Sequence, residues 1–313
     1  MAAPLRRALL ASLLLLLLQL AAGAQQLFTS IVAGQNTNPD IIATGMYTSD
    51  PALSVMLPSI PNGGFVLGVA VDKSSGVIYF TVFNNALHAS TVVAATPVAG
   101  GGYTLTTIAG NYLGSATNDG VGTAASFQEL CSIDVDGSGN VYVADILAGN
   151  VRKLTPGAGG YTVSTILTGF SQYFYSALAV LPNGTLYYAD GGDSIVYEAI
   201  ETGGTYTATA IAGSATCFPL YSNPCYDYDG VGDAARFFNP AGVAVNSVTG
   251  AVYVMDSNNR KVKELTQSGG IWTVTTIAGL HYGSSSCTSD CVDGASPQAP
   301  VPCLFAFTHA RLL

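Results

Sequence analysis

Short hydrophobic runs recur along the chain, and polar or glycine-rich turns separate them. The four runs that are almost continuously apolar are residues 67–71, 132–135, 177–180 and 242–245. Runs of this length, bounded by turn residues, are typical of strands that are buried on both faces. Each is followed by a short polar turn, at 72–76, 136–140, 182–185 and 246–250, and then by a second apolar run. The pattern therefore predicts a series of antiparallel hairpins.

The phrase Thr-Ile-Ala-Gly marks the end of each repeating unit. It stands at 107–110 and 276–279, with a near copy at 210–213 and looser copies at 30–34 and 165–169. Before it lie a third strand and a glycine-rich turn, and the third strands at 150–154 and 260–265 carry charges, as an exposed edge should. Four antiparallel strands per unit, repeated in tandem, predict the blades of a β-propeller.

Two segments carry a more specific signature. The sequence DGVGTAASF stands at 119–127 and DGVGDAARF at 229–237, and each precedes a Val-Tyr-Val-x-Asp strand. This order resembles the NHL repeat, and the resemblance covers about residues 28–279. It implies an all-β propeller of four-stranded antiparallel blades. The repeats at 111–169 and 214–279 match closely, whereas those at 28–110 and 170–213 lack the Asp-Gly loop.

The last part of the chain, residues 280–313, begins another Asp-Gly loop and another apolar run and then stops. We therefore expect one propeller over residues 25–313, with four complete blades and a partial fifth. Because such folds usually close by pairing strands from the two ends, this pattern predicts a ring truncated relative to a complete propeller.

Residues 1–24 have the organisation of a secretory signal peptide. Arg6 and Arg7 precede the apolar stretch 8–20, and Ala22-Gly23-Ala24 is a small-residue cleavage site. The alternative is a membrane anchor, but a span needs roughly 20 apolar residues, and no later stretch provides them. We therefore predict a secreted protein. In such a protein, the sequon Asn183-Gly184-Thr185 predicts N-glycosylation at an apparent turn.

Six cysteines remain for an exported chain, where disulfides are the default expectation. Short separations predict the bridges Cys217–Cys225 and Cys287–Cys291. Cys131 and Cys303 either pair with each other or stay free. A zinc site is the alternative for these cysteines, but Cys-x-x-Cys pairs are missing.

The charge balance excludes one class of partner. Lysine and arginine number ten, and the formal net charge is −9. Nucleic-acid binding requires clustered basic residues, so we expect none. The acidity favours solubility, with a cation-binding face as the alternative.

Several acids are candidates for metal ligands or catalytic residues. Residues 134–145 nearly fit a calcium loop, but the equivalent turns 72–76 and 246–250 are ordinary hairpins, which favours a turn. Asp145, Asp190 and Asp256 each end a second strand. They form either a ring of carboxylates that holds a cation, or caps for backbone donors and partners for cations such as Arg152 and Arg260. A feature that recurs with the repeat favours the structural interpretation.

The three histidines, His88, His281 and His309, share no spacing that would bring them to one site. Propeller enzymes that resemble this fold, the peptidyl-hydroxyglycine lyases and lactonase-like hydrolases, use a metal held by several histidines or carboxylates. We therefore expect no cofactor and assign no catalytic residue. A metal-dependent lyase or hydrolase remains the alternative function.

The leading hypothesis is a binding or scaffold module for a protein, peptide or glycan. The long loops 111–127 and 214–238 are the predicted contact elements. The second is rich in aromatic residues, a type favoured at binding hot spots: Phe218, Tyr221, Tyr226 and Tyr228. The alternative for these side chains is packing beneath a loop tied by a disulfide.

Overall fold

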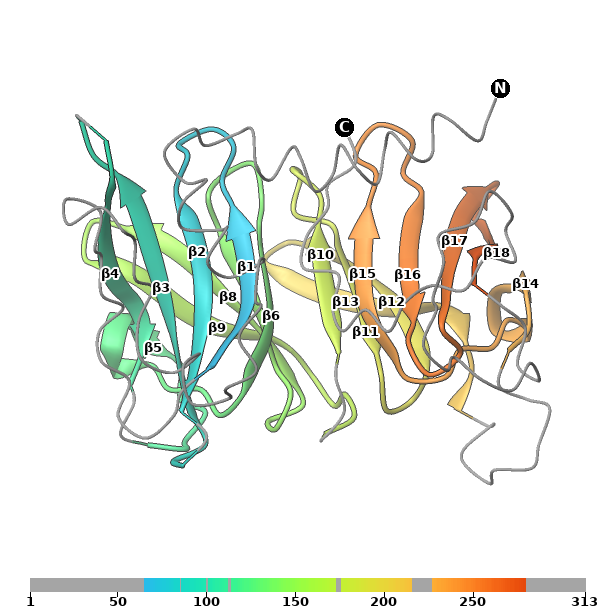
Figure 1. Ribbon diagram of the computed structural model, residues 1–313, viewed down its shortest axis with the longest axis horizontal. Coiled ribbons are helices and arrows are strands. Elements are labelled where there is room, and N and C mark those ends of the chain that lie inside the picture. The colour runs from blue at the N-terminus through green and yellow to red at the C-terminus, as the bar shows by residue number, and fades with distance from the viewer. Residues whose placement is uncertain are drawn as a thin grey trace, which may run out of the picture.

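The computed structural model describes residues 65–84, 86–99, 101–111, 114–172, 176–215 and 227–279. Within these residues the chain forms four antiparallel sheets, one for each predicted repeat (Figure 1). The predicted all-β propeller blades are therefore confirmed. The proposed leader and the partial fifth repeat lie outside the described residues.

Each sheet is a blade whose strands follow one another in space as they do in sequence. Blade 1 contains β1 (Phe65–Val71), β2 (Ile78–Asn84), β3 (Ala89–Pro97) and β4 (Tyr103–Gly110). Blade 2 contains β5 (Gly120–Val121), the 3-10 turn η1 (Gly122–Ala124), β6 (Leu130–Val135), β7 (Val141–Asp145), β8 (Asn150–Gly157) and β9 (Gly160–Thr168). Blade 3 contains β10 (Ala177–Val180), β11 (Leu186–Asp190), β12 (Ile195–Thr202) and β13 (Thr205–Gly213). Blade 4 contains β14 (Gly230–Val231), η4 (Gly232–Ala234), β15 (Pro240–Val245), β16 (Val252–Asp256), β17 (Lys261–Ser268) and β18 (Ile271–Ala278).

The presence of the Asp-Gly loop distinguishes two kinds of blade. In blades 2 and 4 this loop supplies the two-residue strands β5 and β14, which pair with the outer edges of β9 and β18. Blades 1 and 3 lack the loop, and in the described residues their sheets end at β4 and β13. Repeats with the Asp-Gly loop therefore differ from repeats without it in how the outer edge of the sheet is covered.

The inner strands stack on one another along the series of blades. β6 packs against β1 and β10, and β10 packs against β15. In Figure 1 these inner strands lie toward the middle of the picture, and β4 and β18 lie toward its margins. Burial of both faces explains why the inner strands are almost continuously apolar in sequence.

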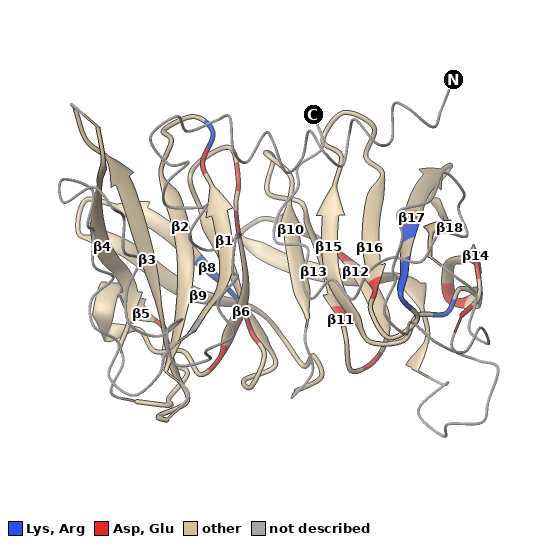
Figure 2. Ribbon diagram, viewed as in Figure 1, with Lys and Arg blue, Asp and Glu red and all other residues tan. Residues whose placement is uncertain are grey.

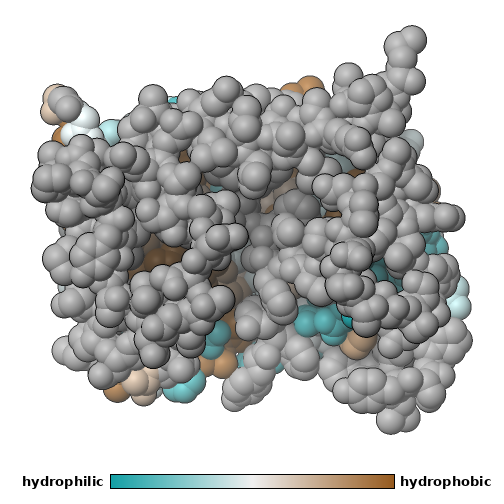
Figure 3. All heavy atoms as spheres, in the orientation of Figure 1, coloured by the Kyte–Doolittle hydropathy of each residue, from teal (hydrophilic) through white to brown (hydrophobic). Residues whose placement is uncertain are grey.

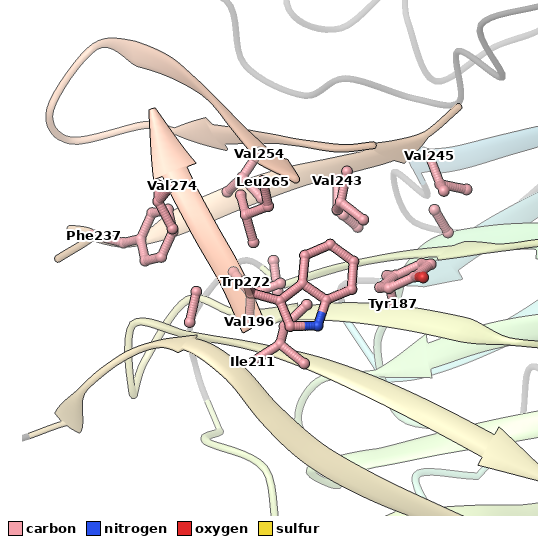
Figure 4. Close-up of a cluster of buried hydrophobic side chains, with 14 of the residues drawn as sticks. Tyr187, Val196, Ile211, Phe237, Val243, Val245, Val254, Leu265, Trp272 and Val274 are labelled. Atoms are coloured by element: carbon pink, nitrogen blue, oxygen red, sulfur yellow. The ribbon is translucent and has the colours of Figure 1, made fainter. Parts of the chain in front are cut away.

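The hydrophobic core consists of layers between adjacent blades. The layer between blades 3 and 4 centres on Trp272, which packs beside Tyr187 with ring centroids 6.0 Å apart (Figure 4). The same contact recurs between Tyr79 and Tyr161, and again between Tyr142 and Tyr206. In each case an aromatic residue of a second strand meets one near the start of the next blade's fourth strand.

The glycine of the Thr-Ile-Ala-Gly phrase is required by a close approach between chain segments. Gly110 has a φ of 91°, and a Cβ there would lie 2.5 Å from the Ser90 carbonyl oxygen and 2.9 Å from the Phe127 ring. Gly213 meets Ser194 and Phe237 in the same way. The glycine of one repeat and the phenylalanine of the next Asp-Gly segment therefore recur together because they pack together.

The expectation of exposed charges on the third strands was wrong for Arg152 and Lys263. Both side chains are fully buried. A β-bulge between the third and fourth strands recurs at this position in every blade, next to Val93, Arg152, Tyr197 and Lys263. The third strand is covered by the fourth strand and, in blades 2 and 4, by the Asp-Gly loop, so its charges need internal partners.

The meander order gives the propeller two distinct faces. The described segments that lead into blades 2 and 4, residues 114–129 and 227–239, lie at the same end of the strands as the turns between second and third strands; we call this end the loop face. The turns between first and second strands lie at the opposite end, the hairpin face. Two of these, between β1 and β2 and between β15 and β16, are at the top of Figure 1.

Candidate functional site

In blades 2 and 4, one aspartate of the leading loop binds both the buried cation of the third strand and a threonine of the fourth strand. We call this arrangement the clamp. The Asp119 carboxylate accepts hydrogen bonds from Arg152 (2.6 Å) and from the backbone N–H (3.0 Å) and hydroxyl (2.9 Å) of Thr165. Asp229 bonds in the same way to Lys263 (3.2 Å) and to the N–H (2.8 Å) and hydroxyl (2.7 Å) of Thr276. Each clamp joins the leading loop to the third and fourth strands of its own blade.

The clamp acids are charged groups fixed by donors. Partial burial raises the pKa of Asp119, but the hydrogen bonds from Thr165 and Arg152 outweigh burial and hold this pKa below its ordinary value. Thr276 and Lys263 lower the pKa of Asp229 in the same way. Both carboxylates therefore act as anionic anchors, although each side chain is almost half exposed.

Blade 3 lacks every part of the clamp. Tyr197 occupies the position of the buried cation and packs edge-on against Phe170, with ring centroids 5.4 Å apart. Ala210 stands where the clamped threonine of blades 2 and 4 stands. In blade 1 the cation position is the buried Val93. Aromatic or aliphatic packing thus replaces the ion pair where the Asp-Gly loop is missing.

The acids at the ends of the second strands cap backbone donors of the leading segments. Asp145 accepts from the N–H groups of Gln128 and Glu129. Asp190 accepts from Ser171 (2.9 Å), and Asp256 accepts from Phe238 (2.6 Å). These bonds confirm the structural interpretation of the recurring acids.

The cations beside these acids correspond only in part to those expected. Arg152 lies 3.8 Å from Asp145, as predicted. The cation that the structure places by Asp256 is Lys263, at 4.0 Å, rather than the expected Arg260. The Arg260 side chain is on an exposed turn, where the backbone has a φ of 56°, and the cation position lies three residues further along the third strand.

Blade 4 concentrates charge beneath the loop face. The buried ammonium of Lys263 lies 3.1 Å from Asp227 and 3.2 Å from Asp229, and Lys261 also pairs with Asp227. Figure 2 shows the blue residues of β17 close to red residues near β14 and at the end of β16. Burial raises the pKa of Asp256 to about 7, although Lys263 opposes the shift. Lys261 and Lys263 are therefore used inside the fold.

The segment that nearly fits a calcium loop is a hairpin turn. Asp136 accepts from the N–H groups of Ser138 (2.8 Å) and Asn140 (2.9 Å), as the turn interpretation predicts. Among the described residues, no group of His, Cys, Asp and Glu side chains is arranged to hold a metal ion.

Sequence reasoning missed a bridge between the inner strands of blades 2 and 3. The buried Asp134 carboxylate accepts from the N–H groups of Val135 and Val180, both at 2.7 Å. Ser132 accepts from Leu178 at 3.1 Å. The available signal was an acid in the middle of a buried strand, where the equivalent residues of the other repeats are alanine.

His88 is the one predicted histidine within the described residues. It lies on an exposed turn before β3, with a φ of 45°, and its ring is 6.1 Å from that of Phe83. His88 is therefore a surface residue. His281 and His309 lie outside the described residues, so the alternative of a metal-dependent enzyme stays a prediction.

Of the aromatic residues predicted to contact a ligand, Tyr228 is described, and it is 49% exposed. Its carbonyl oxygen accepts from the Arg236 N–H (2.9 Å) and from Lys263 (3.2 Å), which fixes its backbone to blade 4. Val231 and the equivalent Val121 are also about half exposed. Phe218, Tyr221 and Tyr226 lie outside the described residues. In the view of Figure 3, hydrophobic and hydrophilic described residues both contribute to the lower margin.

Cys131 is a free thiol, and its Sγ donates to the Ser176 carbonyl oxygen at 3.0 Å. Burial raises the pKa of this thiol to about 12, so it is not an activated nucleophile. The bridges Cys217–Cys225 and Cys287–Cys291 lie outside the described residues and stay predictions. Non-reducing peptide mapping would test them.

The described part of the chain contains no helix with the length and apolar character of a membrane span.

Solved structures with the same fold include two from Bacteroides species. An auxiliary nutrient binding protein from Bacteroides ovatus is 16% identical, with a TM-score of 0.51, over 70% of this chain and 48% of that one. A putative phosphatase from Bacteroides thetaiotaomicron is 17% identical, with a TM-score of 0.51, over 72% and 52%. The chain thus spans about half the length of these structures, and their different descriptions indicate a shared fold rather than a shared function.

No curated protein matches the chain. The family profile of the teneurin NHL domain matches residues 122–295, which is more than half of the chain. The matched region begins in the Asp-Gly loop of blade 2, three residues after Asp119, and includes the whole clamp of blade 4. The chain belongs to the teneurin NHL domain family.

Proposed function

We propose that this protein is a secreted binding module whose loop face binds a protein, peptide or glycan. The observation that carries the proposal is the contrast within residues 227–231, in the described part of the leading loop of blade 4. Its acids are bonded to Lys263 and Thr276, whereas Tyr228 and Val231 remain about half exposed. Rigid loops that present aromatic and aliphatic side chains are typical of recognition surfaces.

Rigidity supports binding because a loop that is already ordered loses little entropy when a ligand binds. The Asp229 clamp fixes the loop at the start of β14, and Lys263 and Arg236 fix the Tyr228 carbonyl oxygen three residues before Val231. A substitution at Val231 would therefore change the surface without removing a bond of the clamp.

The binding proposal can be tested with arrays of extracellular proteins and glycans. We expect Val231→Asp to weaken binding at least tenfold, since it places a charge at the contact surface. Val248→Asp is the matched control, because Val248 is 79% exposed on the hairpin face. Binding that survives at position 231 but is lost at position 248 would contradict the assignment to the loop face.

Secretion is supported by the organisation of residues 1–24. Expression of the full chain with its own leader in eukaryotic cells should release protein into the medium, with an N-terminus near Gln25. Retention in the cells with Met1 in place would contradict secretion.

A further inference from the structure

Asn183 lies on an exposed turn whose shape suits a covalent modification. The turn joins β10 and β11 and is closed by the backbone bonds from Leu181 N–H to Thr185 (2.8 Å) and from Gly184 N–H to Leu181 (2.9 Å). Gly184 has a φ of 88°, a conformation that favours glycine. The conformation of the turn therefore requires a glycine at the middle position of the sequon.

The two amide atoms of the Asn183 side chain have different roles. Oδ1 accepts from the Thr185 N–H at 3.1 Å and holds the side chain in an Asx turn. Within the described residues this is the one hydrogen bond of that side chain, which leaves Nδ2 to the solvent. A substituent on Nδ2 can thus be carried without loss of the turn.

We propose that Asn183 carries the single N-linked glycan of this protein and that this glycan shields the hairpin face. The proposal rests on the proposed secretion, because the donor is an oligosaccharide on a lipid diphosphate in the secretory pathway. The bond from Nδ2 to the sugar C1 forms as the bond from C1 to the diphosphate breaks. Nδ2 loses one proton, and the lipid diphosphate leaves.

The position of the turn determines what the glycan covers. The Gly137 N–H donates to the Pro182 carbonyl oxygen at 3.1 Å, so the hairpin turns of blades 2 and 3 touch. A glycan on Asn183 therefore stands over both turns. The leading loops lie at the opposite end of the strands, so they stay accessible.

Asn183-Gly184-Thr185 is the single Asn-x-Ser/Thr sequon in the sequence, which makes the experiment simple. The full chain, with residues 1–24 replaced by a strong heterologous leader, is secreted from eukaryotic cells. Its mass is measured by mass spectrometry before and after treatment with peptide N-glycosidase. We expect one glycan on the wild type and on Thr185→Ser, and none on Asn183→Gln or Thr185→Ala. A secreted wild type without a glycan, or a glycan that persists on Asn183→Gln, overturns the proposal.

Footprinting with hydroxyl radicals tests the position of the glycan on the same protein. Removal of the glycan should increase labelling of Pro182 and leave Tyr228 unchanged. Increased labelling of Tyr228 would contradict the assignment to the hairpin face. Because the leader is replaced, failure of native secretion and failure of glycosylation give different results. Urea unfolding of Asn183→Gln shows whether the variant is folded.

Discussion

The Arg152 guanidinium donates to the Asp119 carboxylate across 2.6 Å, although the arginine side chain is fully buried and the aspartate is half exposed. Lys263 and Asp229 repeat this relationship in blade 4. The ion pair joins a leading loop to the inside of a blade. In both blades, a partly exposed aspartate thereby provides the charge partner of a buried cation.

Removal of the acid should cost more stability than replacement of the cation. Asp119→Ala leaves Arg152 buried, with Asp145 at 3.8 Å as its remaining charged partner and the Ser126 carbonyl oxygen as a hydrogen-bond acceptor. We expect a loss of about 2 kcal/mol in the free energy of unfolding, because solvent at the exposed acid offsets part of the effect. Arg152→Met should cost less, since Asp119 is half exposed and the buried Asp145 keeps its hydrogen bonds from the Gln128 and Glu129 N–H groups. Urea denaturation measures both, and a larger loss for Arg152→Met would refute this reasoning.

The repeated glycine at the end of the fourth strand should be intolerant of alanine. Gly213 has a φ of 92°, and a Cβ there would collide with the Ser194 backbone. We expect Gly213→Ala to cost about 3 kcal/mol, the sum of a left-handed conformation and a steric clash. Gly204→Ala is the control. Gly204 has a φ of 84° with open space around it, so the cost should be about 1 kcal/mol. Equal losses by thermal or urea unfolding would argue against the clash.

Asp256 should make the protein less stable as the pH rises from about 4 to about 7. Burial raises the pKa of Asp256 in the folded chain to about 7, compared with an ordinary value of 3.8. In this range the folded state holds a proton that the unfolded state has released, so a rise in pH favours unfolding. Asp256→Asn should flatten this part of the stability curve. Urea midpoints at pH 4.5 and pH 7.5 test the prediction, and an unchanged slope in the variant would remove Asp256 as the cause.

The outer strand of blade 3 should be a site of association between chains. β13 has an uncharged sequence and several exposed threonines, and in the described residues it ends its sheet. Thr207→Lys should reduce aggregation during refolding, because a charge on an edge strand opposes pairing with another chain. Thr273→Lys in blade 4 is the control, since Thr273 already pairs with Val231 of β14. Light scattering during refolding would show whether the two variants differ.

Much of the fold could be predicted from the sequence because its signals are local. Apolar runs, polar turns and the repeated Ile-Ala-Gly phrase located the strands, and Asp145 and Asp256 were correctly interpreted as caps. The burial of Arg152 and Lys263 could not be predicted from the strand pattern alone. Their environment depends on an Asp-Gly loop more than 30 residues earlier in the chain and on the recurrent bulge. The charged residues on the third strand were therefore interpreted as exposed.

The hydrogen-bond partner of Asp134 in the next blade could not be predicted for a related reason. Alternation along a strand tells which residues share a face, but it does not tell which neighbouring backbone lies opposite. The Val180 N–H that bonds to Asp134 belongs to the next blade. Only the packing of blade on blade brings these groups together.

The aromatic contacts between blades all run in one direction along the chain. Tyr79, Tyr142 and Tyr187 each lie in the earlier blade, and their partners Tyr161, Tyr206 and Trp272 lie near the start of the last strand of the next. During synthesis, the ribosome therefore delivers each tyrosine some 60 to 90 residues before its partner. A newly completed blade meets a surface that has already been made, which favours assembly from the N-terminal blade onward as the chain emerges.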